Sequence, residues 1–303
     1  MLLALLVMTA AWGSTFYLIK DIVTRIPVTD LLALRFAIGS LGLLAVAGRQ
    51  LRMSRSTVRS GAALGLLYGS AQLLQTYGLA QTAASVSGFI TGLYVVATPL
   101  LGAAILRTRI PRTVWLAVAL ATIGLGVLSL NGFSIGYGEL LTCASALIYA
   151  GHILALSRLS EPGAAISLSL VQTAVVSILC GAVALWPAAG SQPGIQLPAS
   201  TGDWLVVVYL GLVAGALTMV LQTWAQARID PTRAAVIMAM EPVWAAAFAV
   251  ALGGELITVR MVTGGLAILA AMYLVELAPQ RKPMPVAEVA TTAEPRTTEE
   301  YSG

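Results

Sequence analysis

Residues 220–244 read VLQTWAQARIDPTRAAVIMAMEPVW: an apolar segment ends, a short charged turn follows, and a second apolar segment contains Glu241-Pro242. An earlier stretch, residues 74–99, has the same plan and reads LQTYGLAQTAASVSGFITGLYVVATP. A chain that repeats one apolar hairpin in its two halves is predicted to be a duplicated membrane protein.

Two polar triplets mark this repeat. Gln75-Thr76-Tyr77 aligns with Gln222-Thr223-Trp224, and each is followed by a turn and a segment that contains a proline. Pro99 takes the place that corresponds to Pro242, although four more residues separate it from its turn. That difference predicts about one extra helical turn in the first copy. We expect Pro99 and Pro242 to bend their helices, and both are candidate hinges.

The composition requires lipid as the solvent. Of the 303 residues, 58% are hydrophobic and only 10% are charged, whereas a soluble domain carries about 25% charge. The net charge of +4 comes from basic residues between apolar runs, so it orients a membrane protein and does not indicate nucleic-acid binding. Cys143 and Cys180 lie inside apolar segments and are expected to be packing residues, with no disulfide framework.

Apolar runs of about 20 residues predict transmembrane helices. The chain contains ten, so the predicted fold class is an all-α membrane protein with ten transmembrane helices. They cover about residues 2–19, 29–48, 60–80, 85–106, 112–130, 137–157, 165–187, 203–226, 232–252 and 258–277. The tail, residues 279–303, is rich in Pro, Thr and Glu and is predicted to be disordered.

The distribution of lysine and arginine predicts the orientation. If the first residue is cytoplasmic, the inner loops and the tail hold thirteen basic residues, and the outer loops hold only Lys20, Arg25 and Arg260. Because cytoplasmic loops carry the excess of positive charge, both termini are expected in the cytoplasm and the protein in the cell membrane.

Five spans in each half give the two halves opposite topology. The predicted repeats are residues 1–135 and 136–278, related by a two-fold axis in the membrane plane. Gln75 then lies toward the outer end of its helix and Gln222 toward the inner end of its own helix.

Glu241 is the strongest functional candidate. It lies near the middle of a span, where a charge costs several kcal/mol unless it is paired, solvated or neutralised. Pro242 beside it cannot donate a backbone hydrogen bond and leaves the Met238 carbonyl without its helical partner. An acidic group beside freed backbone suits a site that responds to protons or cations. The alternative is a buried, protonated glutamate that holds helices together.

Arg35 and His152 are further ionisable residues within predicted spans. Arg35 is expected to extend outward to the lipid interface, and an internal ion pair or an anion contact is the alternative. His152 is the only histidine and cannot form a metal site without nearby ligands. It is a candidate cavity residue that titrates, with packing as the alternative. No metal or cofactor is expected.

The other candidates are hydrogen-bonding and aromatic residues. Glutamines and threonines of the two repeated triplets can hydrogen-bond across helices, and aromatic residues deep in a span can form cavity walls. Glycines spaced by four permit close helix contact in two spans, at Gly61, Gly65 and Gly69 and at Gly211 and Gly215. The full set of predicted cavity residues is Trp12, Gln75, Tyr94, Thr98, Tyr149, His152, Gln222, Glu241 and Trp244.

Several short motifs resemble those of the EamA-type transporters, a family within the drug/metabolite transporter superfamily. The segment from Trp12 to Phe16, followed by Lys20, resembles the opening signature of that family, and Leu34-Arg35-Phe36 resembles the start of its second helix. Glu241-Pro242-Val243, with Gly254-Glu255-Leu256 and Thr258, is similar to its ninth helix and the exit from that helix. The resemblance covers about residues 1–278.

The resemblance implies an inverted five-plus-five repeat, a central cavity, and export of small metabolites, with the amino-acid exporter branch as the nearest match. Two departures argue against a mechanism that needs symmetric acidic groups. Arg107-Thr108-Arg109 replaces the acidic residue that often ends the fourth helix of the family, and Thr98 rather than Glu precedes Pro99.

We therefore expect a secondary transporter that works by alternating access, with a small-molecule substrate bound near the midplane. A passive channel or uniporter is the alternative. An intramembrane enzyme is less favoured, because it would need a nucleophile with a base or clustered metal ligands. The expected partners are the substrate and the lipid bilayer, without nucleic acid, and the protein is expected to be a monomer or homodimer.

Overall fold

The computed structural model describes residues 2–48, 51, 53–106, 110–131, 134–160, 163–186, 195–226 and 238–277. The predicted tail, residues 279–303, lies outside these ranges. So do residues 232–237 of the ninth predicted span and Arg107-Thr108-Arg109.

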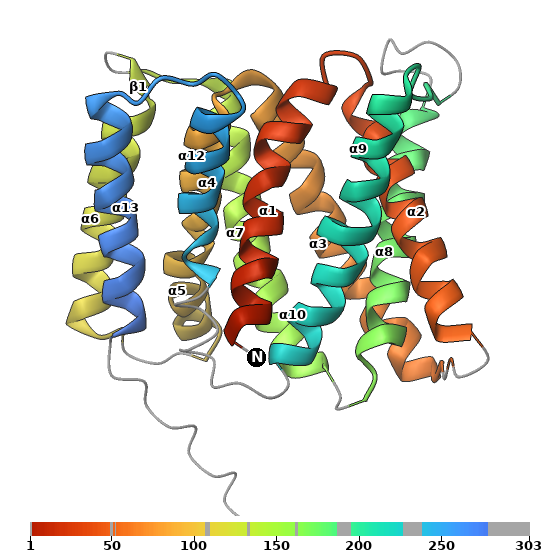
Figure 1. The fold of residues 1–303 in the computed structure, drawn as a ribbon. Helices are drawn as coiled ribbons and strands as arrows, with labels where there is room; N and C mark the ends of the chain where they lie inside the picture. Colours follow the sequence, from red (N-terminus) through yellow and green to blue (C-terminus); the bar gives the residue numbers. More distant parts are fainter. Residues whose placement is uncertain are drawn as a thin grey trace, which may run out of the picture.

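Nearly all of the described chain is helical (Figure 1). The helices are α1 (Leu2–Ile22), α2 (Val28–Ala47), α3 (Arg55–Gln81), α4 (Ala84–Gly92), α5 (Tyr94–Leu106), α6 (Arg112–Ser129), α7 (Tyr137–Leu159), α8 (Ala165–Ala184), α9 (Thr201–Gly211), η3 (Leu212–Leu217), α10 (Thr218–Gln226), α12 (Glu241–Ala251) and α13 (Val259–Glu276). Two short strands, β1 (Leu130–Asn131) and β2 (Ser134–Ile135), pair antiparallel between α6 and α7.

The predicted all-α membrane fold with ten helices is confirmed. In the described chain α4 and α5 follow one another as one interrupted rod, and α9, η3 and α10 form another, so the described helices make ten rods. Five of the described spans are long and apolar enough to cross a membrane: Val28–Ala47, Ala84–Ile105, Tyr137–Leu159, Ala165–Ala184 and Thr201–Ala225.

Capping side chains fix several helix starts that hydropathy alone places less accurately. α3 begins at Arg55, about one turn before the apolar run that predicts it, because the Ser54 hydroxyl accepts a hydrogen bond from the Thr57 amide at 2.9 Å. Ser200 and Thr258 cap α9 and α13 in the same way. Each cap satisfies an amide that the first turn of a helix leaves without a partner.

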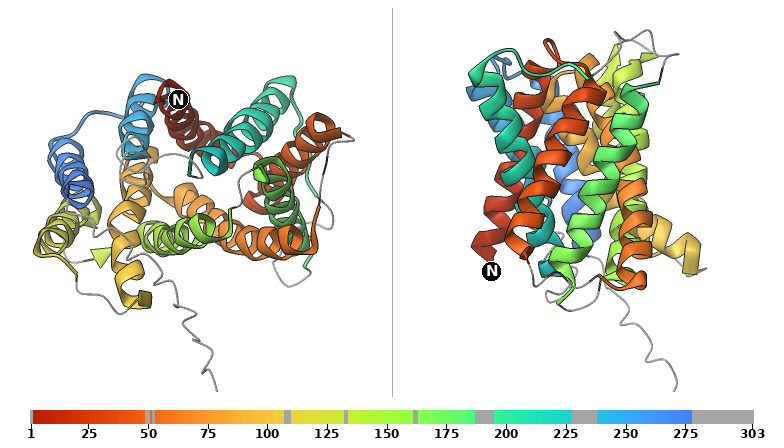
Figure 2. Two further views of the ribbon diagram at one scale, coloured as in Figure 1. Left: turned by 90° about the horizontal axis from the view of Figure 1, so that it is seen from below. Right: turned by 90° about the vertical axis from the view of Figure 1, so that its right-hand side faces the viewer.

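The rods are arranged as a two-fold repeat would require. The fifth rods of the two halves, α6 and α13, pack together at one edge of the molecule, and the second rods, α2 and α8, pack together toward the opposite edge (Figure 2). Since each half has an odd number of rods, equivalent rods run in opposite directions. α1 begins and α13 ends at the same end of the molecule (Figure 1).

Glycines let the rods approach closely, as the sequence predicts. A Cβ on Gly65 of α3 would lie 2.8 Å from the Val175 Cβ of α8. A Cβ on Gly211 would lie 2.5 Å from the carbonyl oxygen of Arg35, so α9 can meet α2 here only without a side chain. This contact between α2 and α9 fixes the position of Arg35 in the fold.

Candidate functional site

The described chain leaves regular helix just before α5 and just before α12, in the middle of the molecule, and we call these two places the interruptions. α4 ends at Gly92 and α5 begins at Tyr94, with Leu93 in a turn between them. In the second half Ala239 and Met240 form a turn before α12 begins at Glu241. Both interruptions lie within two turns of a predicted hinge proline, and bending and movement at these prolines stay predictions.

Proline explains both interruptions, but from different positions. Pro99 lies inside α5, where it cannot donate to the Val95 carbonyl and its ring crowds the preceding turn. Pro242 lies in the first turn of α12, where an amide would lack an intrahelical partner in any case. The two prolines are thus not equivalent residues of the repeat.

The equivalent residues are Tyr94 and Glu241. Tyr94 stands nineteen residues after Gln75, and Glu241 stands nineteen residues after Gln222. Each is the first residue of the half-helix that follows the interruption. The extra turn that we predicted for the first copy follows from aligning the prolines, whereas aligning the interruptions gives both copies the same spacing from the glutamine. The prediction itself stays untested, because residues 227–237 lie outside the described residues.

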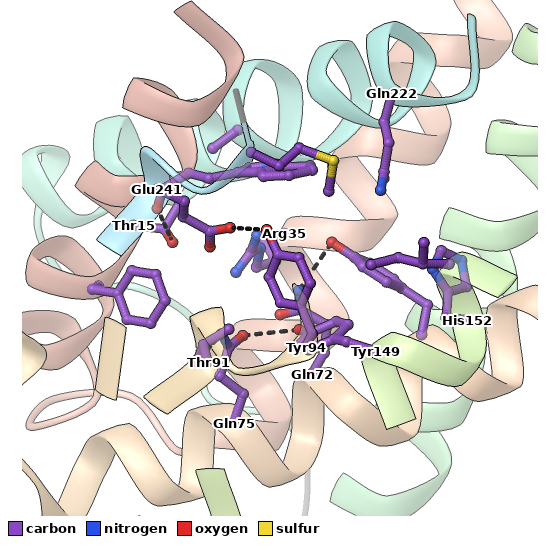
Figure 3. A pocket seen from close by; sticks show the side chains of 16 residues that line it. Thr15, Arg35, Gln72, Gln75, Thr91, Tyr94, Tyr149, His152, Gln222 and Glu241 are labelled. Carbon is purple, nitrogen blue, oxygen red and sulfur yellow. Dashed lines mark hydrogen bonds between the residues drawn. The ribbon is translucent and has the colours of Figure 1, made fainter. Parts of the chain in front are cut away.

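Tyr94 and Glu241 meet in the interior. The Tyr94 hydroxyl donates to Glu241 Oε2 at 3.1 Å, and Glu241 is only 6% exposed (Figure 3). The carboxylate also lies at the N-terminus of α12, where the helix dipole favours negative charge. Equivalent positions of the two halves thus join directly, through one hydrogen bond.

A cavity of about 60 Å³ lies beside this contact. By the criterion of about 10–15 Å³ for one water molecule, it has room for a few waters or for a compact solute. Side chains from nine of the described helices line it: Trp12, Thr15, Phe16, Arg35, Tyr68, Gln72, Gln75, Thr91, Tyr94, Tyr149, His152, Ile153, Ala214, Gln222, Glu241, and Met238 before α12.

Seven of the nine predicted cavity residues line this space, and Thr98 and Trp244 do not. The Thr98 hydroxyl donates to the Tyr94 carbonyl at 2.7 Å, within its own helix. Trp244 packs against Phe248 of α12, with ring centroids 6.3 Å apart, and against Gly13 of α1. Both therefore lie behind the cavity wall in this conformation.

Gln75 organises one wall of the cavity. Its side-chain amide donates to Thr91 Oγ1 at 3.1 Å, and its carbonyl oxygen accepts from the Tyr149 hydroxyl at 2.9 Å. The three residues come from α3, α4 and α7. One glutamine thereby satisfies polar groups of both halves of the protein, where lipid offers no other partner.

Trp12 and His152 are also held by hydrogen bonds. The Trp12 indole donates to the Thr218 hydroxyl at 2.9 Å, which joins α1 to α10. His152 is 1% exposed, and its Nε2 pairs with Gln172 Oε1 at 2.9 Å. Because this ring nitrogen already has a partner, the structure supports a packing role for His152 in the cavity wall.

Arg35 is the main cavity residue that sequence reasoning placed wrongly. We expected its side chain to extend to the lipid interface, but it is 3% exposed and lines the cavity (Figure 3). Hydropathy gives the depth of a residue in the membrane, and it gives neither the rotation of the helix nor its neighbours. Packing sets the position of Arg35, since Gly211 lets α9 approach the backbone of Arg35 closely.

Other lining residues had a recognisable signal that the prediction did not use. Tyr68, Gln72 and Gln75 are spaced by four and three residues on α3, so they share one face of the helix. A polar stripe of this kind in an apolar helix marks the side that faces a cavity or a polar partner. Tyr68 and Gln72 are joined by a hydrogen bond of 2.9 Å.

A π-helical segment, η3, forms the wall that contains Ala214. A Cβ on Gly215 would lie 2.9 Å from the Leu210 carbonyl oxygen, and the Thr218 hydroxyl donates to the Ala214 carbonyl at 2.7 Å. The glycine accommodates the widened turn, and the threonine satisfies a backbone acceptor. Such π-segments frequently occur at functional sites.

Polar contacts also join the two halves at the end of the molecule opposite the start of α1 and the end of α13. Arg25, between α1 and α2, bonds to Asp21 at 2.6 Å and to Asp203 of α9 at 2.8 Å. Hydrogen bonds to Asp21 and Asp203 raise the pKa of Arg25 above its ordinary value. Glu255, which follows α12, accepts from the amide of Ala84 at 2.6 Å and from the hydroxyl of Ser85. Glu255 thereby caps the N-terminus of α4 in the other half.

Comparison with known proteins gives a family and a fold. The EamA-like transporter family matches the chain twice, over residues 1–130 and 136–277. An uncharacterized transporter of Archaeoglobus fulgidus is 28% identical over 276 residues, which are 91% of this chain and 85% of that protein. A solved structure, described only as the crystal structure of a protein, has a TM-score of 0.65 and 19% identity. It covers 89% of this chain and 95% of its own. That structure shows the shared fold alone.

The wall built around Gln75 generates a stability prediction. Replacing Gln75 with leucine leaves the Tyr149 hydroxyl and the Thr91 hydroxyl without this partner in the interior. We expect a loss of about 1–3 kcal/mol of stability, seen as a lower melting temperature of the purified protein. Gln81→Leu on the same helix is the control, because Gln81 is exposed and bonds only to the Tyr77 carbonyl of its own helix. Equal melting temperatures for the two variants would contradict the role given to Gln75.

Proposed function

The chain belongs to the EamA-like transporter family and is a membrane transporter, and we propose that it exports small amphipathic metabolites, amino acids or related compounds, as a secondary transporter. The observation that carries this proposal is the polar cavity at the Tyr94–Glu241 contact. It lies where the half-helices α5 and α12 begin, one in each half. Substrate sites of transporters with inverted repeats are typically built from interrupted helices at the midplane.

The proposed mechanism is alternating access. The two halves rock about the interruptions before α5 and α12, so that the cavity opens to one side of the membrane and then to the other. The contacts of Asp203 with Arg25 and of Glu255 with Ser85 support this mechanism, since both join the halves at one end. A state open at that end would have to break them.

Each lining residue has a proposed role in substrate binding. Glu241 contacts a proton or the cationic amine of the substrate. Trp12 and Tyr149 provide aromatic walls, and Gln75 and Gln222 provide hydrogen bonds. Pro99 and Pro242 are the proposed hinge residues, each within two turns of an interruption. Thr98 and Trp244 would reach the substrate only if the half-helices move.

The proposed repeats are residues 1–135 and 136–278, which the two separate family matches support. We place the protein in the cell membrane with both termini in the cytoplasm. Arg55, Arg112 and Arg158 lie at the end of the molecule where α1 begins, and Lys20, Arg25 and Arg260 lie at the opposite end. Arg59 lies in the second turn of α3, near the same end as Arg55, and the remaining basic residues of the predicted inner loops and tail lie outside the described residues.

Side-specific labelling tests this orientation. A cysteine added at either chain end should react with a membrane-impermeant maleimide in inside-out vesicles and stay unmodified in spheroplasts. Labelling of the two ends from opposite faces would contradict an even number of spans.

Reconstitution tests the function. Liposomes that contain the purified protein should take up labelled amino acids faster than protein-free liposomes, and Glu241→Gln should reduce this flux by about tenfold or more. Glu139→Gln is the matched control. Glu139 lies in the first turn of α7, apart from the cavity lining, and its oxygen accepts from Thr82 as an amide oxygen also could. No flux above protein-free liposomes across a broad panel of amino acids would contradict the proposal.

An imposed pH gradient separates coupled transport from the passive alternative. If Glu241 carries the coupling proton, the gradient accelerates flux through the wild type and leaves the residual flux of Glu241→Gln unchanged. A uniporter or channel would transport at the same rate with and without the gradient in both proteins. Loss of flux in Glu139→Gln as well would show that the effect is not specific to Glu241.

A further inference from the structure

The cavity holds a buried cation that the proposed mechanism has not used. Arg35 is 3% exposed, and its guanidinium lies 4.8 Å from the ring centroid of Phe36. Its Nε atom is buried without a hydrogen-bond partner. Arg25 forms ion pairs with Asp21 and Asp203 at 4.0 Å or less, whereas Arg35 forms none with the residues that the structure describes. Arg35 therefore has no carboxylate partner among the described residues.

Burial of the Arg35 guanidinium without a counter-charge costs free energy unless another group binds it. An isolated charge in a low-dielectric interior is strongly destabilised without a partner. The contact with the Phe36 ring offsets only a part of this cost. The surrounding aromatic residues fix the ring, since Phe36 packs edge-on against Tyr68 with centroids 5.9 Å apart. Arg35 thus lies at the cavity wall beside a well-packed ring, with at least one guanidinium donor that no described residue binds.

Glu241, the anionic residue of the same cavity, pairs with Tyr94 and not with Arg35. Glu241 also lines the cavity, yet its carboxylate accepts from Tyr94 and lies beyond ion-pair distance of Arg35. Figure 3 shows the two side chains reaching into one space from different helices. A cation and an anion that share a cavity without touching are complementary to a solute that carries both charges.

We propose that Arg35 is the carboxylate-binding subsite of the cavity and Glu241 its ammonium-binding subsite, so that the substrate is a zwitterionic α-amino acid. The guanidinium fork matches a carboxylate in shape and binds it through two hydrogen bonds. The cavity of about 60 Å³ favours a short apolar side chain, against Phe16 and Ile153. This inference rests on the proposed transport function and specifies the substrate of that site.

Three small probes separate the charges of the substrate. L-valine carries both groups, L-valinamide keeps the ammonium and replaces the carboxylate with a neutral amide, and 3-methylbutanoate keeps only the carboxylate. Calorimetric titration of the purified full-length protein should give L-valine a dissociation constant at least roughly tenfold lower than that of L-valinamide. Arg35→Gln should abolish this preference, so that L-valine and L-valinamide bind with equal dissociation constants. Glu241→Gln should instead reduce the preference for L-valine over 3-methylbutanoate.

Arg158→Gln is the control, because Arg158 is exposed at the end of α7, apart from the cavity lining. It should bind all three probes as the wild type does. Arg35→Lys keeps the charge without the planar fork, and it should retain a preference for L-valine that is smaller than that of the wild type. Arg35→Gln could fail to fold, which gel filtration would show. The preference for L-valine over L-valinamide in the wild type, and its decrease in Arg35→Lys, then test the inference.

Equal binding of L-valine and L-valinamide by the wild type overturns the inference, as does an unchanged preference in Arg35→Gln. A wild type that binds none of the three probes also overturns it. A failure of the proposed transport function would give a different set of results. In that case no amino acid crosses reconstituted liposomes, while binding of L-valine or 3-methylbutanoate still depends on Arg35.

Discussion

The hydrogen bond between Tyr94 and Glu241 joins the two halves of the protein at the depth where lipid cannot solvate a carboxylate. Within the hydrocarbon layer every polar group must find its partner inside the protein. Glu241 finds one at the equivalent position of the other repeat, because both residues begin a half-helix after an interruption. The repeat therefore brings together the starts of two half-helices, α5 and α12, in the interior.

The rest of the structure supports this meeting point. α1 contacts α12 through Gly13, and α4 contacts α12 through Gly88, so the helices around the interruptions approach without intervening side chains. Polar residues gather where that approach leaves a space, and they satisfy one another across α3, α4 and α7. A tightly packed frame around a small polar cavity can bind a solute at the midplane, provided that the two halves can move relative to each other.

Much of the fold follows from the sequence, because each span needs about 20 apolar residues and the chain interrupts them with charged or turn-forming residues. Glu241, Tyr94 and Gln75 were found by depth and by repetition. The failures have one physical cause. Hydropathy assigns depth, whereas rotation about the helix axis and the identity of neighbours depend on packing. Trp244 lies at the predicted depth, but its ring packs against Phe248. Arg35 was predicted to reach the lipid interface, but its side chain is buried and lines the cavity. The prolines misled the repeat alignment, because one lies inside a half-helix and the other at its start.

The central claim of the proposed mechanism is that water reaches the polar cavity between the two halves from one side of the membrane at a time. The most direct measurement uses Thr15→Cys, at the cavity wall near Glu241 (Figure 3), in a protein whose two cysteines are replaced by Cys143→Ala and Cys180→Ala. We predict that the thiol reacts with a charged, membrane-impermeant reagent, and that the accessible face changes during turnover. A cysteine at Leu41, 65% exposed on α2, should stay unreactive in lipid. A thiol at residue 15 that reacts only with a lipid-soluble reagent, and with the charged one from neither face, would contradict the account.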